Sequence, residues 1–350
     1  FWLKPFWLKA IFCSSRLGLN LAACACVVST PPEAMAAAAT RFADPWFRKY
    51  DKATEGFVDS MGFTNRLPLR LESTEVLIHG LVDAEKMWAE FADEQYVPIL
   101  VGGKAVVSIW FNNFTDTDCG GEYWETWYNT FVTPKGKPQL DLPAEGGPMA
   151  AITEPSALIF LQRVVCSDTP RNPGAAMKAI VGGREIWGFP KHPDLGRITL
   201  AYEESDGKKV GFRFEAEHSG SDVVKLSIRL PEADEGALEI PLEAESAPDT
   251  AISCPRGHCG IKQARYGQAF KCTQYVKPWD AATDSLAFGD DAHYAAPIKG
   301  WDFVPVLKVH SPDFKIAAFK PVGWISGDEA DAMVKEHEAK LAAGTMGGAL

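Results

Sequence analysis

From residue 76 onward, the chain divides into short segments rich in β-branched, aromatic and alternating apolar residues, and these segments are separated by turns. This pattern predicts strands. The expected strands are residues 76–82, 98–114, 123–133, 157–166, 198–203, 210–217, 223–230, 266–276, 303–309 and 315–319. Residues 218–222 have the composition of a hairpin connection. Because the strands follow one another through short turns, without a repeated βαβ order, a mainly antiparallel fold is expected.

Few segments have a helical signature. Asp83 could cap a short helix, and residues 175–181 follow an Asn-Pro-Gly cap and end at Gly182-Gly183. A last helix is expected at 327–343, after a capping box that begins at Ser326. We therefore expect an α+β protein, mainly antiparallel β, closed into a barrel or sandwich with helices on its periphery.

The chain begins with a tandem Phe-Trp-Leu-Lys tetrapeptide, and its first Met is Met35. We interpret residues 1–34 as a translated leader that is not part of the fold. The alternative is a targeting peptide, since an apolar stretch is flanked by cations. Residues 35–350 are expected to form one domain with its core at about 66–325. The acidic stretch 232–249 is interpreted as an exposed excursion from that domain.

The charge and cysteine content restrict the partners and the compartment. A net charge of -11 argues against binding to nucleic acid or to anionic membranes. No apolar run is as long as a membrane span. Of the eight cysteines, three lie in the N-terminal segment, and the remaining five are odd in number and lack the spacing of a disulfide framework, which is typical of reduced thiols inside cells. We expect a cytoplasmic protein, or an organellar one if residues 1–34 are a targeting peptide.

The stretch from Gly183 to Lys191 has the most specific composition. Gly183 permits a turn with positive φ, Pro190 fixes the backbone before Lys191, and two aromatic residues supply apolar surface. Only a neutral amine attacks a carbonyl, and burial can lower a lysine pKa by about 3–5 units. Lys191 is therefore a candidate nucleophile for Schiff-base formation. The alternative is a surface lysine in a turn.

The run from Ala179 to Lys191, AIVGGREIWGFPK, resembles the active-site signature of the acetoacetate decarboxylase family. In that family an Arg-Glu pair precedes an aromatic-Pro-Lys step, and the lysine forms the Schiff base. Residues 116–126 resemble a second family region and place Glu125 at the catalytic glutamate. The resemblance extends over roughly residues 76–325. It implies a closed, barrel-like antiparallel fold, a homo-oligomer and no cofactor or metal.

The resemblance also implies roles for residues near the lysine. Arg184, Trp187 and Phe189 are expected to contact or shape the substrate site. The family has a second lysine after the nucleophile, where this chain has His192, a candidate for proton transfer. The N-terminal substrate-binding arginine of the family has two candidates here, Arg66 and Arg70, of which Arg70 is preferred.

Three functions remain open at this point. The first is a carboxy-lyase that decarboxylates a β-keto acid through an iminium on Lys191, with Glu125 or His192 moving protons. The second is a Schiff-base aldolase or dehydratase that acts on an oxo acid. The third is a non-catalytic barrel that binds an apolar ligand. A zinc site at residues 254–259 with Cys272 is disfavoured, because no second ligand pair follows at metal spacing.

Overall fold

The computed structural model describes residues 42–91, 96–136, 138–233, 236–253, 263–320 and 323–325. The interpreted leader at 1–34, the cysteines at 254–259 and the expected helix at 327–343 lie outside these residues. In the described part, no helix is long and apolar enough to cross a bilayer.

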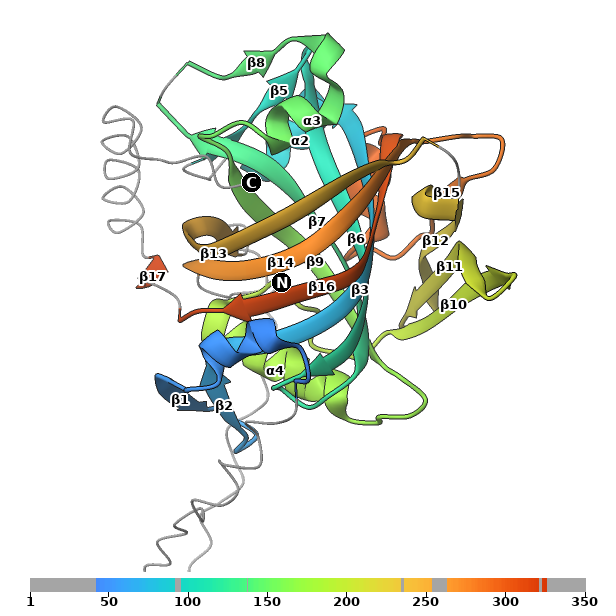
Figure 1. The fold of residues 1–350 in the computed structure, drawn as a ribbon. Coiled ribbons are helices and arrows are strands. Elements are labelled where there is room, and N and C mark those ends of the chain that lie inside the picture. Colours follow the sequence, from blue (N-terminus) through green and yellow to red (C-terminus); the bar gives the residue numbers. More distant parts are fainter. Residues whose placement is uncertain are drawn as a thin grey trace, which may run out of the picture. The chain divides into compact units, whose positions relative to one another are not determined.

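Strands dominate the described chain, as the sequence predicts (Figure 1). The strands are β1 (Glu55–Val58), β2 (Thr64–Leu67), β3 (Leu69–Asp83), β4 (Tyr96–Pro98), β5 (Leu100–Val101), β6 (Lys104–Thr117), β7 (Tyr123–Pro134), β8 (Asp141–Leu142), β9 (Leu158–Asp168), β10 (Arg197–Ser205), β11 (Lys208–His218), β12 (Ser221–Arg229), β13 (Leu238–Ser253), β14 (Gln263–Pro278), β15 (Ser285–Phe288), β16 (Val304–Ala318) and β17 (Gly323–Ile325). The α-helices are α2 (Ala84–Met87), α3 (Gly147–Ile152), α4 (Ala175–Trp187) and α5 (Ala295–Gly300). Short 3-10 helices are η2 (Pro45–Tyr50), η3 (Trp88–Phe91), η4 (Ala144–Gly146) and η5 (Pro231–Ala233).

The described strands form three sheets, and nearly all of their pairings are antiparallel. The largest has eleven strands in the order β4-β7-β9-β13-β14-β16-β3-β6-β5-β8, with β17 on β14. A second sheet has the order β10-β11-β12-β15, and β1 pairs with β2 alone. The hairpin between β11 and β12 lies where the sequence predicts it. Its turn residues Ser219 and Gly220 both have positive φ.

The prediction of a sheet closed into a barrel is wrong for the described residues. In the largest sheet, which is strongly curved, the additional pairing of β6 with β7 joins seven strands in a ring, but the sheet as a whole keeps two ends, because β4 and the pair β5-β8 extend beyond that ring. The strands β10, β11, β12 and β15 form a sheet of their own. Alternation of apolar residues predicts which segments are strands, but the same apolar face can be buried by a second sheet. Here Phe214 of β11 packs against Phe111 of β6, with ring centroids 5.0 Å apart.

Helix α4 extends further than the sequence predicts. Gly182-Gly183 does not end it, since both residues are helical and the helix continues to Trp187. The left-handed residue that ends it is Gly188, with φ 65°, and not Gly183. Glycine is normally a poor residue inside a helix. Here its missing side chain is needed for close packing, as the site shows.

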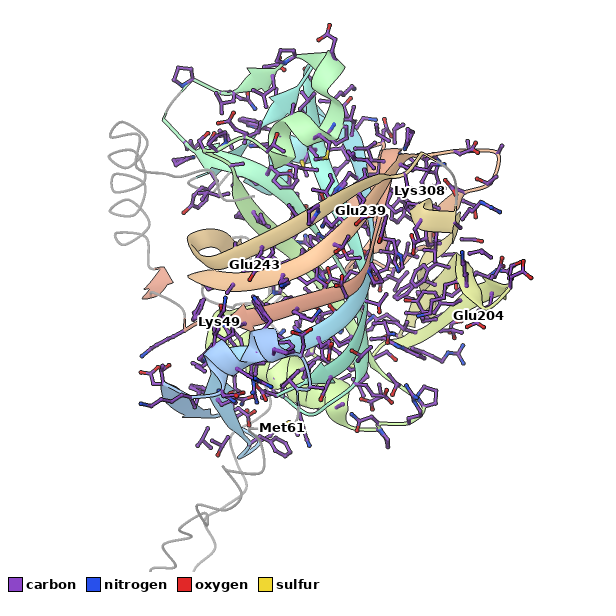
Figure 2. All side chains as sticks on the ribbon, in the orientation of Figure 1. Lys49, Met61, Glu204, Glu239, Glu243 and Lys308 are labelled. Atoms are coloured by element: carbon purple, nitrogen blue, oxygen red, sulfur yellow. The ribbon has the colours of Figure 1, made fainter. Side chains whose placement is uncertain are left out.

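The acidic stretch after residue 232 is not an irregular excursion. Most of it belongs to β13, which pairs along its length with β14. Glu239 and Glu243 alternate with apolar residues on this strand and are exposed, and Lys49 approaches Glu243 at 3.7 Å (Figure 2). The acidic composition therefore marks the outer face of a strand. The two strands predicted at 303–309 and 315–319 are likewise one strand, β16, with a register irregularity between them.

Candidate active site

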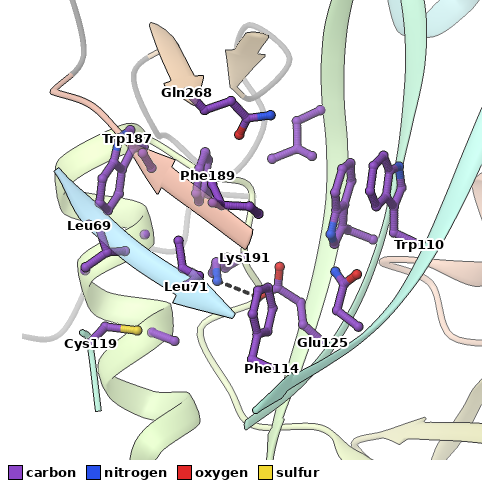
Figure 3. A pocket seen from close by; sticks show the side chains of 18 of the residues that line it. Leu69, Leu71, Trp110, Phe114, Cys119, Glu125, Trp187, Phe189, Lys191 and Gln268 are labelled. Carbon is purple, nitrogen blue, oxygen red and sulfur yellow. Dashed lines mark hydrogen bonds and ion pairs between the residues drawn. The ribbon is translucent and has the colours of Figure 1, made fainter. Parts of the chain in front are cut away.

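A cavity of about 120 Å³ lies on the inner face of the curved sheet and is bounded by α4 (Figure 3). Its walls are mainly apolar and aromatic. The side chains that line it come from alternate positions of β3, β6, β7, β9, β14 and β16, because successive residues of a strand point to opposite faces. A dry cavity of roughly 150 Å³ can hold a molecule the size of benzene. The space here is that of a small organic ligand.

Lys191 and Glu125 meet at the wall of this cavity (Figure 3). Nζ of Lys191 lies 2.5 Å from Oε2 of Glu125, and the two residues are 3% and 6% exposed. Their positions differ by 66 in the sequence, so only the folded chain brings them together. The sequence-predicted nucleophile and the sequence-predicted carboxylate therefore form a buried ion pair.

Backbone pairing fixes the position of Lys191. The amide of Val164 on β9 donates to the carbonyl of Pro190, and the amide of His192 donates to the carbonyl of Val164. The side chain of Lys191 then passes directly over Gly183 of α4. A Cβ on that glycine would lie 2.7 Å from Cε of Lys191, which is too close for any real side chain. The missing side chain of Gly183 thus leaves the space that the side chain of Lys191 occupies.

The pKa of Lys191 moves in the opposite direction to the expectation from the sequence. Burial lowers this pKa, but the neighbouring Cys166 and the hydrogen-bonded Glu125 together raise it by more than burial lowers it. The net pKa of Lys191 therefore lies above the ordinary lysine value. Burial also raises the pKa of the Cys166 thiol, which is neutral at pH 7 and donates to Glu125 Oε2 at 3.2 Å. The charge that holds Lys191 protonated is therefore the Glu125 carboxylate.

A row of polar side chains crosses the cavity wall on neighbouring strands. In the sheet register, Glu75 of β3 pairs with Asn112 of β6, and Asn112 pairs with Glu125 of β7. Burial raises the pKa of Glu75 to about 8, although Ser73 donates a hydrogen bond to Oε1 at 2.8 Å. Its Oε2 and the Oδ1 of Asn112 have no hydrogen-bond partner among the described residues. Two buried polar atoms, the Oε2 of Glu75 and the Oδ1 of Asn112, are thus available to a ligand.

Sequence reasoning missed Glu75, Asn112 and Cys166. The sequence does carry a signal for Glu75, which directly precedes the apolar strand predicted at 76–82. A carboxylate that is buried with such a strand must be neutral or have a partner. Asn112 and Cys166 carry no such signal. Their place beside Glu125 depends on the register of three strands, which is a tertiary property.

The structure brings some of the expected substrate residues to the cavity and others not. Trp187 and Phe189 line it, with their rings stacked at a centroid distance of 5.7 Å. Arg184 instead donates to the backbone carbonyl of Lys191, so it holds the loop. His192 is half-buried and is not among the lining residues; its ring packs on that of His218 with centroids 3.8 Å apart.

Neither candidate arginine from the N-terminal part reaches the cavity. The guanidinium of Arg70 is fully buried and binds Asp118 at 2.9 Å and Asp51 at 2.6 Å. Arg66 donates to the backbone carbonyl of Asp51 at 3.0 Å. Both arginines hold the segment before β3, and neither is among the lining residues.

Comparison with solved structures gives distant matches of similar extent. An acetoacetate decarboxylase from Legionella pneumophila is 17% identical, with a TM-score of 0.46 over 78% of this chain and 98% of that chain. An acetoacetate decarboxylase-like enzyme from Sphingomonas wittichii RW1 is 11% identical, with a TM-score of 0.42 over 73% and 93%. The matched proteins include acetoacetate decarboxylases and acetoacetate decarboxylase-like enzymes.

The enduracididine biosynthesis enzyme MppR, solved with pyruvate, also matches, at 12% identity and a TM-score of 0.44 over 73% of this chain and 88% of that chain. No protein-family model matches the chain, and no relative was found among curated proteins. Likeness at this distance does not transfer an activity. The function is therefore argued from the cavity itself.

Proposed function

We propose that the protein is a Schiff-base-forming carboxy-lyase that decarboxylates a small β-keto acid through an iminium on Lys191. The observation that carries the proposal is the buried contact between Lys191 and Glu125 at the wall of an apolar cavity. A surface lysine in a turn would have neither the burial nor the partner. An amine beside a base, in a site that excludes water, is the arrangement that amine catalysis requires.

Glu125 is the base that makes Lys191 nucleophilic. In water a lysine ammonium and a carboxylate keep their charges, but removing water from around the pair favours the neutral amine and the carboxylic acid. The pair is already almost fully buried, and a substrate that fills the cavity closes the remaining access of water to it. The proton then moves along the 2.5 Å contact from Nζ to Oε2, and the free amine adds to the substrate carbonyl carbon.

The carbon–oxygen bond of the resulting carbinolamine breaks as Glu125 returns its proton, and water leaves to give the iminium. The iminium next accepts the electron pair of the carbon–carboxylate bond, so CO₂ departs and an enamine remains. Protonation of the enamine carbon, followed by addition of water to the iminium, releases the ketone and regenerates the amine. One proton is taken up from solvent in each turnover.

Glu75 is suited to deliver that proton. Its pKa of about 8 keeps it mostly protonated at pH 7, whereas Glu125 is the partner of Lys191 in the buried ion pair. Two strand spacings, about 10 Å, separate the backbones of the two glutamates, so a small substrate fits between them. Carboxyl groups whose surroundings drive their protonation states apart are the pattern of an acid and a base in one site.

The charge of the cavity favours loss of a carboxylate over its retention. Among the described residues that line the cavity, Lys191 is the only cation. An aldolase or dehydratase acting on an oxo acid must hold the substrate carboxylate through the reaction, and a buried anion without a cation is costly. A decarboxylase removes this charge as CO₂, so an apolar wall raises the free energy of the reactant more than that of the transition state.

Borohydride reduction in the presence of acetoacetate, followed by peptide mass mapping, tests the Schiff base. We expect the adduct on Lys191 and none on Lys308, a buried lysine that is paired with Asp284 but does not line the cavity. Failure to label Lys191 with any oxo acid would overturn the proposal. A CO₂-release assay beside a pyruvate–aldehyde condensation assay then tests the reaction: condensation without CO₂ release would keep the nucleophile and refute the lyase.

A further inference from the structure

A second polar cluster lies next to the loop that carries Lys191 and contributes no residue to the lining of the cavity. It consists of His192 and Asp194, in the turn after Lys191, and His218 at the end of β11. One ligand atom of each residue, a ring nitrogen or a carboxylate oxygen, lies within 4.8 Å of the others. These residues come from two segments and take no part in the Schiff-base chemistry proposed above.

His218 has the setting of a preorganised ligand. It is 5% exposed, and its Nδ1 lies 3.2 Å from Oδ2 of Asp291, a carboxylate that is itself held by the backbone amide of Tyr294. Nε2 of His218 is buried and has no hydrogen-bond partner among the described residues. A histidine that binds a metal through one nitrogen usually donates its other ring N–H to a carboxylate or carbonyl. The free nitrogen of His218 is therefore the one that would bind.

The neighbouring rings crowd the same point. His192 packs edge-on against His218 at a centroid distance of 3.8 Å, and His293 lies 4.8 Å from His192. Nε2 of His293 is also buried without a partner in the described chain. Nδ1 of His192 accepts the backbone N–H of Asp194 at 3.1 Å. Because Asp194 is exposed, water can replace this bond when Nδ1 is used elsewhere.

We infer that His192, Asp194 and His218 form a binding site for a divalent transition metal, with Zn²⁺ as the best match. Two imidazole nitrogens and one carboxylate oxygen are ligands that Zn²⁺ accepts, and water completes the tetrahedron. Bond lengths of about 2.0–2.1 Å place tetrahedral ligands roughly 3.4 Å apart. To bind one ion, the ligand atoms must come closer together than 4.8 Å. The side chains of Asp194, which is exposed, and His192, which is half-buried, can make this movement. The inference does not depend on the proposed decarboxylase.

A metal here would join the turn that follows Lys191 to β11. Backbone hydrogen bonds to Val164 and Cys166 hold that turn to β9 in the structure described. A bound ion would add a second attachment one residue from the nucleophile. The site would thus stabilise the loop of Lys191 without touching the cavity.

Titration of the chelator-treated full chain with Zn²⁺ by calorimetry, and with Co²⁺ by visible absorption, tests the site. We expect one bound ion, lost in His218→Ala and in His192→Asn, and weakened about 10–100-fold in Asp291→Asn through the outer contact. Asp194 is exposed and His192 is half-buried, so we expect His192→Asn and Asp194→Asn to fold. These two variants therefore still test the site if His218→Ala does not fold.

The matched control changes residues 254–259, the other stretch of the chain that contains both histidine and cysteine. Cys254→Ser with Cys259→Ser should leave binding unchanged. Loss of binding in this double variant, with retention in His192→Asn, would assign the ion to that stretch and overturn the inference. The absence of a stoichiometric ion in the wild-type chain would overturn it as well.

Discussion

Gly183 and Lys191 are complementary in shape: a Cβ on Gly183 would lie 2.7 Å from Cε and 3.0 Å from Cδ of Lys191. The lysine can reach Glu125 only because α4 has no side chain at this point. Glycine costs a helix about 1 kcal/mol relative to alanine. This cost is offset by burial of the lysine stem in the groove that the glycine leaves.

We predict that Gly183→Ala displaces Lys191 from Glu125 and reduces borohydride trapping at least tenfold. Gly182→Ala is the matched control, because it makes the same gain in helix propensity one residue away. The nearest atom to its Cβ would be Oδ1 of Asn65, at 3.2 Å, and the side-chain amide of Asn65 can shift. Trapping rates of the two variants at a fixed acetoacetate concentration check this. Equal rates would show that Gly183 is not needed for the position of the lysine.

We predict that Glu125→Gln removes both the base and the buried counter-charge of Lys191. Breaking a buried ion pair by removing one partner typically destabilises a protein by about 3–5 kcal/mol. Loss of a general base slows a reaction by roughly 10²–10⁴-fold. Urea unfolding and trapping kinetics measure the two effects. The double variant Glu125→Gln with Lys191→Met should recover part of the lost stability, whereas additive losses would mean that the pair is not coupled.

We predict that stability falls as pH rises from about 4.5 to 8 because of Glu75. Its pKa is 4.5 in the reference state and about 8 when buried, so the folded chain holds a proton that the unfolded chain releases in this range. The loss is a few kcal/mol at ~1.4 kcal/mol per unit and is complete above pH 8. The difference in unfolding free energy between wild type and Glu75→Gln, followed with pH, isolates this contribution. A difference that is independent of pH would refute it.

We predict that ionisation of Glu75 also lowers the rate of catalysis at high pH. Decarboxylation should fall above pH 8, as Glu75 loses the proton that it delivers and its charge repels an anionic substrate. Glu75→Gln should lower kcat and remove this basic limb from the pH profile. Glu72→Gln is a useful control, since Glu72 lies on the same strand but is not among the lining residues. A basic limb that persists in Glu75→Gln would assign it to another group.

We predict that Arg184 positions Lys191 and takes no part in the chemical steps. Its guanidinium holds the carbonyl of Lys191 and does not line the cavity. Arg184→Gln should slow trapping about tenfold without moving the pH at which trapping is half-maximal. Arg184→Lys, which can still donate one hydrogen bond, should restore part of the rate. A shifted pH dependence would mean that Arg184 acts on the charge of Lys191.

The sequence alone determined the local features. Alternating apolar residues located the long strands, and the composition of residues 183–191 pointed to Lys191 as the candidate nucleophile with its aromatic neighbours. The strand 123–133 that carries Glu125 followed from its composition, and Glu125 and Lys191 could both be named in advance as candidate catalytic residues through the family resemblance. These inferences succeed because side-chain direction within one strand depends on neighbouring residues only.

Only the tertiary structure decided the rest. The separate sheet around β11 and the row from Glu75 to Glu125 depend on which strands pair and in which register. The extension of α4 through Gly183 goes with the close packing of that glycine against Lys191. The charge of Lys191 is the clearest case. Its sequence surroundings are apolar and predict a lowered pKa, whereas a carboxylate 66 residues away raises it. Electrostatic energy depends on distance in space, and the order of residues along the chain does not specify that distance.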